Sequence, residues 1–288
     1  MRKHLKRFIP ILVLTVALLV ISAVSRNVRE ADASEPRISM PIVMYHHIQK
    51  SSKKLGNYCI SPEQLRADFQ YIKDHGYTPI TSRELLNFMD FGQPLPEKPI
   101  MITFDDGYLS NYVYAYDLLR EFNFKAVISI IGSQTDKYTE IDDKNAAYAY
   151  INWETALEMQ ESGYVEFANH TYDMHTQYPR KGCKRLGGES IDDYTVCLTN
   201  DIMTLENKMY EYLGKRSAIF TYPFGAVSDC CPDIIRGLGF RITLGCEEGM
   251  NRLSQNPDCL YGLKRYNRAH RYGTEDFFNT VFAGKRLK

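Results

Sequence analysis

The chain has 288 residues, which is enough for one sizeable hydrophobic core and does not require two domains. Apolar residues make up 44% and charged residues 24%, as in ordinary globular proteins. The 35 lysines and arginines balance the 35 aspartates and glutamates, which argues against a broad electrostatic surface for nucleic acid. We therefore expect no nucleic-acid partner.

The N-terminal stretch departs from the globular pattern. Four lysines and arginines within the first seven residues precede an almost wholly apolar run over residues 8–24. This order is typical of a secretory signal or a membrane anchor whose basic flank stays in the cytoplasm. We expect residues 1–30 to be a signal peptide or, preferably, a retained anchor, and 31–38 a linker. Residues 39–288 would then form one extracytoplasmic domain, membrane-anchored or secreted; a buried core helix is the alternative for the apolar run.

Short β-rich runs alternate with amphipathic stretches after this segment. We expect strands at 41–45, 100–104, 126–131, 165–168, 218–221 and 241–244. Helices are expected to begin after Ser61 and to cover 112–122, 153–162, 190–213 and 231–238. Such alternation predicts an α/β fold with a parallel sheet wrapped by helices. If the sheet closes into a barrel, the functional groups should follow its strands, at their carboxyl ends.

The seven cysteines all follow the apolar segment. Export would permit disulfides, and the odd number leaves at least one thiol unpaired. No C-x-x-C pair occurs, which argues against a zinc site built from cysteines.

Two adjacent carboxylates, Asp105 and Asp106, follow the strand expected at 100–104. Gly107 comes next and indicates that the strand ends there, so that both side chains could turn toward one site. Adjacent buried carboxylates repel each other unless a cation lies between them or one holds a proton. One could bind a metal while the other acts as a base. A helix N-cap with a solvated neighbour is the structural alternative.

Two histidines follow the strand expected at 165–168. His170 and His175 are five residues apart, a spacing that fits neither one helix face nor alternate strand positions. Their imidazoles can converge only from a loop or a distorted turn. Imidazole is the commonest metal ligand, and an Asp/His/His set leaves a position open for water. Either histidine alone would more often be structural, but together with the two aspartates they predict a metal site.

Two further strand ends carry groups of possible catalytic use. The segment 221–225, with sequence TYPFG, indicates a rigid loop that can hold a backbone N–H toward an oxyanion, although such a segment is more often only a turn. His46 and His47 end the first strand, and histidine suits proton transfer near neutral pH. A structural role for this pair stays open.

Together these segments resemble the polysaccharide deacetylases of carbohydrate esterase family four, over nearly all of the chain after residue 38. The segment 103–107, with sequence TFDDG, matches the family's first motif without a gap. The resemblance implies that Asp105 is the catalytic base and Asp106 a metal ligand. It also implies an irregular (β/α) barrel of about seven parallel strands.

The second and third motifs of the family extend the resemblance. His170 and His175 match its two ligand histidines, and Phe224 matches the aromatic residue whose backbone N–H supports the oxyanion. The histidine spacing is similar to that of the branch that deacetylates poly-β-1,6-N-acetylglucosamine. In that branch a Tyr-His strand end replaces the usual late catalytic histidine. This implies that His46 is the general acid, with His47 as the alternative.

Two positions depart from the family's pattern. The third motif usually opens with an arginine that helps to position the base, and this chain has Thr221 there. We expect another cation in that role, and the candidates are Lys264, Arg265 and Arg268. The usual late Leu-x-His motif is not recognisable near 242–245. Its absence agrees with a role for His46, and it would equally fit a chain that has lost activity.

The resemblance implies a hydrolase that removes N-acetyl groups from a polysaccharide containing N-acetylglucosamine, such as poly-N-acetylglucosamine or peptidoglycan, at the cell envelope. A divalent ion held by Asp106, His170 and His175 would polarise the acetamide carbonyl and acidify a water molecule. Zn²⁺ is favoured, and Co²⁺, Ni²⁺ or Fe²⁺ would also suit an N/O site. Two other functions are a catalytically silent glycan-binding protein of the envelope and an esterase that removes O-acetyl groups from a polysaccharide.

Overall fold

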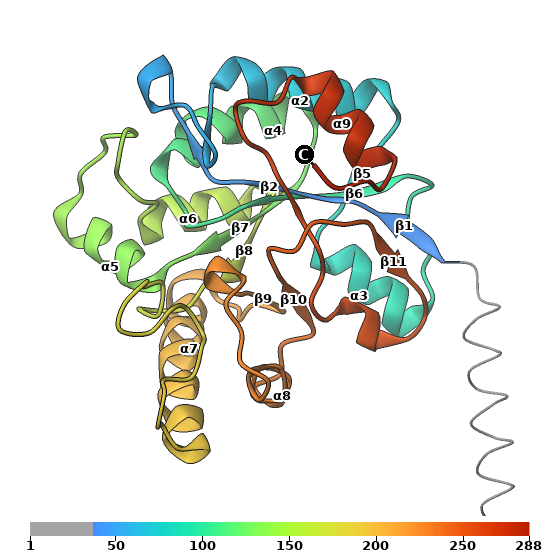
Figure 1. Ribbon diagram of the computed structural model, residues 1–288. Helices are drawn as coiled ribbons and strands as arrows, with labels where there is room; N and C mark the ends of the chain where they lie inside the picture. The colour runs from blue at the N-terminus through green and yellow to red at the C-terminus, as the bar shows by residue number, and fades with distance from the viewer. Residues whose placement is uncertain (1–36, 288) are drawn as a thin grey trace, which may run out of the picture. The chain divides into compact units, whose positions relative to one another are not determined.

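The computed structural model describes residues 37–287, which contain a parallel sheet surrounded by helices (Figure 1). The expected anchor or signal peptide, residues 1–30, lies outside the described residues. Within them, no helix combines the length and the apolar character needed to cross a membrane. The chain divides into a unit that ends at Ile38 and a unit that begins at Ser39, and the second carries the sheet.

The central sheet has seven strands in one hydrogen-bonded series, in the order β10-β9-β8-β7-β6-β2-β12. Every neighbouring pair in the series is parallel, and the short strand β5 pairs in parallel with β6. The strands are β2 Ile42–Tyr45, β5 Thr78–Pro79, β6 Pro99–Phe104, β7 Ala126–Ile130, β8 Val165–Asn169, β9 Ile219–Thr221, β10 Ile242–Leu244 and β12 Tyr266–Asn267. The prediction of a parallel sheet of about seven strands is confirmed.

The two ends of this series, β10 and β12, form no ladder with each other among the described residues. Leu263 forms an isolated parallel bridge with Leu244. The Leu263 N–H donates to the oxygen of Thr243 at 2.8 Å, and the N–H of Gly245 donates to the oxygen of Leu263 at 2.9 Å. Strand β12 itself has two residues, too few for a full ladder with β10. The sheet is therefore an incomplete barrel.

Strand β6 shows how the two faces of the sheet differ. Its residues Ile100, Ile102 and Phe104 belong to the main hydrophobic core, which also contains Phe69 and Leu119 from the surrounding helices. Because side chains alternate along a strand, Met101 and Thr103 face the barrel interior. Asp105, the next residue in this alternation, carries one of the two adjacent carboxylates singled out in the sequence.

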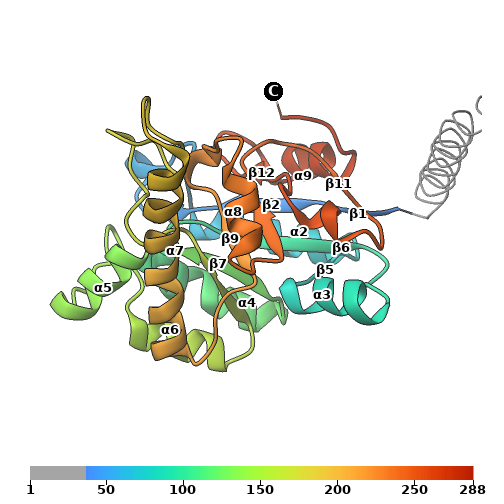
Figure 2. The same ribbon diagram turned by 90° about the horizontal axis from the view of Figure 1, so that it is seen from below.

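Helices cover the outer face, with bounds α2 Pro62–Asp74, α3 Ser82–Phe91, α4 Asp117–Phe122, α5 Gly132–Ile141, α6 Trp153–Glu161, α7 Ile191–Leu213, α8 Cys231–Gly237 and α9 Thr274–Phe282. Helix α2 begins as predicted, because the Ser61 side chain accepts a hydrogen bond from the N–H of Gln64. Figure 1 shows α2, α4 and α9 together above the strands. Figure 2 shows α7 alongside α5 and α6, which it contacts.

Several elements differ from the sequence expectation. The single helix expected at 112–122 consists of a π-helical segment, η2 Asn111–Tyr116, followed by α4. Helices α3, α5 and α9 and strand β12 were not predicted. Short additional elements are β1 Ile38–Met40, which pairs with β11 Asn251–Leu253, β3 His47–Ile48, which pairs with β4 Cys59–Ile60, and the 3-10 turns η1 Ser52–Lys54, η3 Pro223–Gly225 and η4 Pro257–Leu260.

A buried ion pair ties the segment after β12 to helix α2. The Arg268 guanidinium donates to the Asp68 carboxylate at 2.7 and 3.0 Å, and both side chains are fully buried. The hydroxyl groups of Tyr45 and Thr274 donate to the same carboxylate at 3.1 and 2.7 Å. Every oxygen of Asp68 is thus hydrogen-bonded, as a charge in a low-dielectric interior requires.

Replacing Arg268 by Met should leave Asp68 buried without a counter-charge. We expect the free energy of unfolding to fall by about 3 kcal/mol. The matched control is Arg66→Met, because Arg66 and its partner Glu121 are 53% and 51% exposed, and that change should lower the free energy of unfolding far less. Urea denaturation followed by circular dichroism measures both, and equal effects would contradict this account.

Candidate active site

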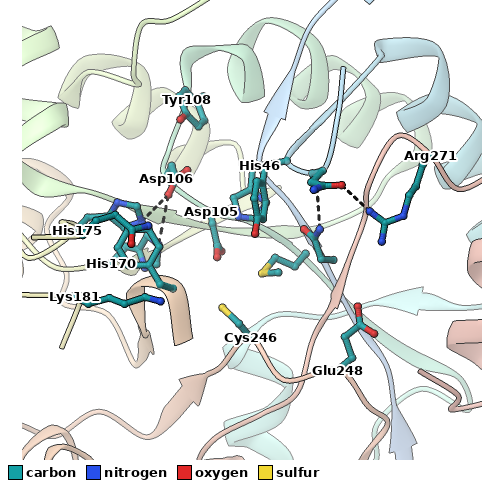
Figure 3. Close-up of a pocket in the computed structure, with 16 residues that line it drawn as sticks. His46, Asp105, Asp106, Tyr108, His170, His175, Lys181, Cys246, Glu248 and Arg271 are labelled. Carbon is teal, nitrogen blue, oxygen red and sulfur yellow. Dashed lines mark hydrogen bonds and ion pairs between the residues drawn. The ribbon is translucent and has the colours of Figure 1, made fainter. Parts of the chain in front are cut away.

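A cavity of about 620 Å³ lies at the carboxyl ends of the central strands (Figure 3). Residues at or shortly after the ends of different strands line it: His46 after β2, Asp105 and Asp106 after β6, His170 and His175 after β8, Phe224 after β9, and Cys246 after β10. The strand ends thus gather the side chains singled out in the sequence, as parallel α/β folds allow.

Three of these side chains form a cluster that could hold a metal ion. The Asp106 Oδ1 atom lies 3.2 Å from His175 Nε2 and 3.6 Å from His170 Nε2. One ligand atom from each of the three residues lies within 4.8 Å of the others. The ring of His170 is oriented by a hydrogen bond from Nδ1 to the oxygen of Thr221 at 2.8 Å, which leaves Nε2 directed at the cluster. One carboxylate and two imidazoles suit Zn²⁺ or a similar divalent ion.

The local backbone turns both aspartates toward the cavity. Asp106 and Gly107 have φ angles of 70° and 74°, in the left-handed region. A side chain at Gly107 would bring its Cβ to 2.8 Å from Ile130 Cγ2, so only glycine fits against β7 there. The reversal at Asp106 breaks the strand alternation, and its carboxylate faces the same cavity as that of Asp105.

The charge states of the cluster follow from burial and from mutual contacts. Burial alone would raise the pKa of Asp106, but the hydrogen bond with His170 and the nearby imidazoles lower it on balance. Burial and the charge of His170 lower the pKa of His175 to about 4. Burial acts to lower the pKa of His170 too, yet the hydrogen bond with Asp106 and the two carboxylates raise it. The cluster therefore stabilises one positive charge beside Asp106, from a proton or from a metal ion.

Asp105 forms a buried bidentate ion pair with Arg265. The guanidinium donates to Oδ1 at 2.6 Å and to Oδ2 at 2.8 Å, and the Arg265 side chain is fully buried. Burial would raise the pKa of Asp105, but the charge of Arg265, followed by that of His170, holds it well below its usual range. Asp105 is thus ionised at every physiological pH.

The structure distinguishes among the three cations proposed to orient this carboxylate. Arg265 contacts it directly, and its Nε also donates to the oxygen of Gly245 at 2.7 Å. Arg268 instead pairs with Asp68, on the opposite side of strand β2, and Lys264 pairs with Glu247 at 3.3 Å. Arg268 was therefore a wrong candidate, because its side chain is directed into the core next to α2.

The structure also distinguishes the two neighbouring histidines. His46 lines the cavity, and its Nδ1 is buried without a hydrogen-bond partner among the described residues. Burial lowers the pKa of His46, although the charges of Asp105 and Asp106 oppose this. His47 lies outside the cavity lining; its Nδ1 is 2.7 Å from Ser110 Oγ and its ring stacks on a tyrosine. His46 is thus the one of the two that can meet a ligand.

Comparison with known proteins agrees with this arrangement. The sequence profile of the family described as polysaccharide deacetylase matches residues 92–243, more than half of the chain. The chain belongs to the polysaccharide deacetylase family. The resemblance inferred from its motifs is confirmed.

Named relatives of this chain are distant in sequence. The poly-β-1,6-N-acetyl-D-glucosamine N-deacetylase of Escherichia coli K12 is 24% identical over 248 residues, covering 78% of this chain and 36% of that protein. The chain thus spans just over a third of that relative's length. The enzyme of the same name from Staphylococcus aureus MRSA252 is 23% identical over 262 residues, covering 83% of this chain and 86% of that protein.

Solved structures of deacetylases share the fold. The de-N-acetylase from Aggregatibacter actinomycetemcomitans has a TM-score of 0.71 at 23% identity and covers 84% of this chain and 99% of that one. IcaB from Ammonifex degensii has a TM-score of 0.65 at 24% identity, with coverages of 79% and 91%. At these identities the likeness shows the fold alone.

Phe224 lies beside the cluster in a strained turn. Its φ angle is 58°, and its ring centroid is 4.4 Å from that of His175. The following residue, Gly225, would bring a Cβ to 2.9 Å from that of Cys246. The turn is therefore held in one conformation between the histidine loop and the loop after β10. The oxyanion role of the Phe224 N–H stays a prediction.

The sequence analysis missed several residues in the cavity wall: Tyr58, Lys181, Cys246, Glu248, Asn267 and Arg271. Only Cys246 and Glu248 carried a usable signal, since they follow the predicted strand 241–244. Asn267 ends the two-residue strand β12, and the others come from loops without periodicity, so nothing local marks them.

Removing a ligand should abolish tight metal binding. We expect Asp106→Ala and His175→Ala to weaken Zn²⁺ binding by more than the roughly 10- to 100-fold that loss of an outer hydrogen-bond partner causes. His47→Ala is the matched control, since that ring lies close by but binds Ser110. Calorimetric titration of the metal-free protein measures each affinity. Wild-type affinity in His175→Ala would contradict the assignment.

Proposed function

We propose that this protein is a metal-dependent hydrolase that removes N-acetyl groups from a polysaccharide containing N-acetylglucosamine, either poly-N-acetylglucosamine or peptidoglycan. The observation that carries the proposal is the juxtaposition of the Asp105–Arg265 pair with the Asp106, His170 and His175 cluster in one cavity. The relatives named poly-β-1,6-N-acetyl-D-glucosamine N-deacetylase support the class of substrate.

The metal site and the base have separate roles in this proposal. Asp106, His170 and His175 would hold the divalent ion, with Zn²⁺ favoured over Co²⁺, Ni²⁺ and Fe²⁺, and the ion supplies a Lewis acid for the acetamide carbonyl and acidifies water. Asp105 accepts a proton from the attacking water molecule. Arg265 keeps this carboxylate ionised and fixes its orientation through two hydrogen bonds. The backbone N–H of Phe224 would donate to the developing oxyanion.

His46 completes the reaction by protonating the departing nitrogen. An amide anion is a very poor leaving group, so the C–N bond breaks only as the nitrogen gains a proton. Because burial lowers its pKa, His46 is neutral at neutral pH and must first receive a proton within the catalytic cycle. Asp105, whose pKa is held low, readily gives up the proton taken from water. The products are acetate and a free amine.

The proposed location is outside the cytoplasm, at the cell envelope, either anchored in the membrane or secreted. It rests on the basic and apolar pattern of residues 1–24, which is typical of exported proteins. The glycans named above are envelope or extracellular polymers, so the substrate and the location agree.

Acetate release from defined N-acetylglucosamine oligosaccharides tests the function. We expect Zn²⁺-dependent acetate together with a new free amine, and a loss of about 10²–10⁴ in turnover for Asp105→Asn with Zn²⁺ binding retained. Bound oligosaccharide without acetate would instead indicate a silent glycan-binding protein. A free hydroxyl in place of the amine, from an O-acetylated polysaccharide, would indicate an esterase.

The role of His46 can be separated from that of the base by changing the leaving group. A phenyl acetate releases a phenolate that needs no proton, whereas an acetamidosugar releases an amine. We expect His46→Gln to lose about 10²-fold or more on the acetamidosugar and little on the phenyl ester. The control, His47→Gln, should retain both activities if it stays folded. Equal losses on both substrates in His46→Gln would contradict a role as general acid.

A further inference from the structure

Glu248 brings an unpaired negative charge to the cavity wall. Its neighbour Glu247 is compensated by Lys264 at 3.3 Å and Arg286 at 3.0 Å. Glu248 forms no ion pair with any residue of the range 37–287, and its Oε2 accepts one hydrogen bond, from the N–H of Leu287 at 3.1 Å. A carboxylate held by one backbone amide retains most of its capacity to accept hydrogen bonds.

This charge lies away from the metal-binding cluster. Figure 3 shows Glu248 on the other side of Asp105 from His170 and His175, and all four line the same cavity. A polymer whose acetamide group reaches the cluster would therefore place a neighbouring sugar near Glu248. The cavity wall also contains Asn267, whose Nδ2 donates to the oxygen of Asn57 at 2.9 Å and whose Oδ1 is buried without a partner in the described structure. Glu248 and Asn267 thus each bring an acceptor oxygen with unused capacity to the cavity wall.

Two cations also line the cavity, but both are more exposed than Glu248. Arg271 donates to neutral oxygens, Asn57 Oδ1 at 2.6 Å and Tyr272 Oη at 2.7 Å, and its side chain lies at the surface. Lys181 is likewise exposed and, in Figure 3, lies beside His170. Because solvent and salt screen exposed charges most, the half-buried Glu248 should dominate the potential at its end of the cavity.

We propose that Glu248 recognises the ammonium group of a glucosamine unit next to the sugar undergoing reaction, so that the substrate is a partly deacetylated polymer. The inference rests on the proposed function, because the deacetylation reaction itself creates this amine. An alkylammonium group offers three donors and one positive charge, which fits a carboxylate that has no ion-pair partner among the described residues. Each turnover would thus improve the binding site for the next one along the same chain.

Defined tetrasaccharides test the proposal. The probes are a fully N-acetylated tetramer and two isomers that carry one glucosamine, placed on either side of the acetylated sugar that reacts. We expect the full-length Zn²⁺-loaded enzyme to show a kcat/KM about tenfold higher for one of the two isomers than for the fully acetylated tetramer. The preference should shrink as salt is raised.

Charge variants identify the residue responsible. In Glu248→Gln the ratio of the two kcat/KM values should fall to about one, and in Glu248→Lys it should fall below one. The matched control is Glu247→Gln, which changes an adjacent, already compensated carboxylate outside the cavity lining and should keep the tenfold ratio. Thermal melts verify that each variant is folded.

Three outcomes would overturn the inference. Equal rates of wild-type enzyme on all three tetramers would refute it and leave the proposed function standing. A preference that survives in Glu248→Gln would assign it to another residue. A preference for a tetramer with a carboxylate-bearing sugar, lost in Arg271→Gln, would make this an anion subsite. If no tetramer releases acetate, the proposed function itself fails.

Discussion

The ion pair between Asp105 and Arg265 is the interaction on which the site depends. A carboxylate buried to this degree would be protonated or strongly destabilising without a counter-charge. Arg265 supplies it in bidentate geometry and also donates to the oxygen of Gly245, past the end of β10, and to Thr103 Oγ1 on β6 at 3.3 Å. The same side chain thus spans the incomplete edge of the barrel and keeps the proposed base ionised.

The position of Arg265 accounts for the absence of the family's usual arginine at position 221, where this chain has a threonine. Where the family's third motif usually has an arginine, Thr221 makes a hydrogen bond with Ser129 Oγ at 2.7 Å, and its backbone oxygen orients His170. The cation reaches Asp105 from the segment before β12 instead. Since the guanidinium approaches the carboxylate from another segment, the end of β9 is left free to orient His170, a proposed metal ligand. The proposed general acid, His46, likewise follows β2 and not the late strand that carries the family's usual catalytic histidine.

The fold could be predicted to the extent that its elements carry periodic or continuous apolar signals. Strand β6 is buried along its whole length and was expected within one residue, since a short continuous apolar run is typical of a parallel strand covered on both faces. Strand β12 has two residues and no period. Helix α5 begins at Gly132 without a capping side chain, so its start has no local mark. Such elements form because neighbouring strands and helices leave room for them.

The residues of the site could likewise be predicted only where they follow elements with a clear sequence signal. Asp105, Asp106 and the two histidines could be identified because they follow strands that were predicted. The choice of Arg265 over Arg268 could not be made, because the two flank strand β12, which was not predicted, and only the alternation along that strand places them on opposite faces. His46 and His47 posed the same difficulty: adjacent side chains at a strand end diverge, and only the packing of His47 against Ser110 decides which one enters the cavity.

The charges of the site favour the direction of the proposed reaction. Asp105 and Arg265 cancel each other, so a divalent ion beside the single carboxylate of Asp106 leaves one net positive charge near the acetamide. This field would stabilise a developing oxyanion and oppose an ammonium group, so it would favour both hydrolysis and departure of the amine product. The unpaired carboxylate of Glu248 presents the opposite field on the other side of Asp105. An amino-sugar polymer would therefore lower its electrostatic energy by moving each new ammonium group from the cluster toward Glu248.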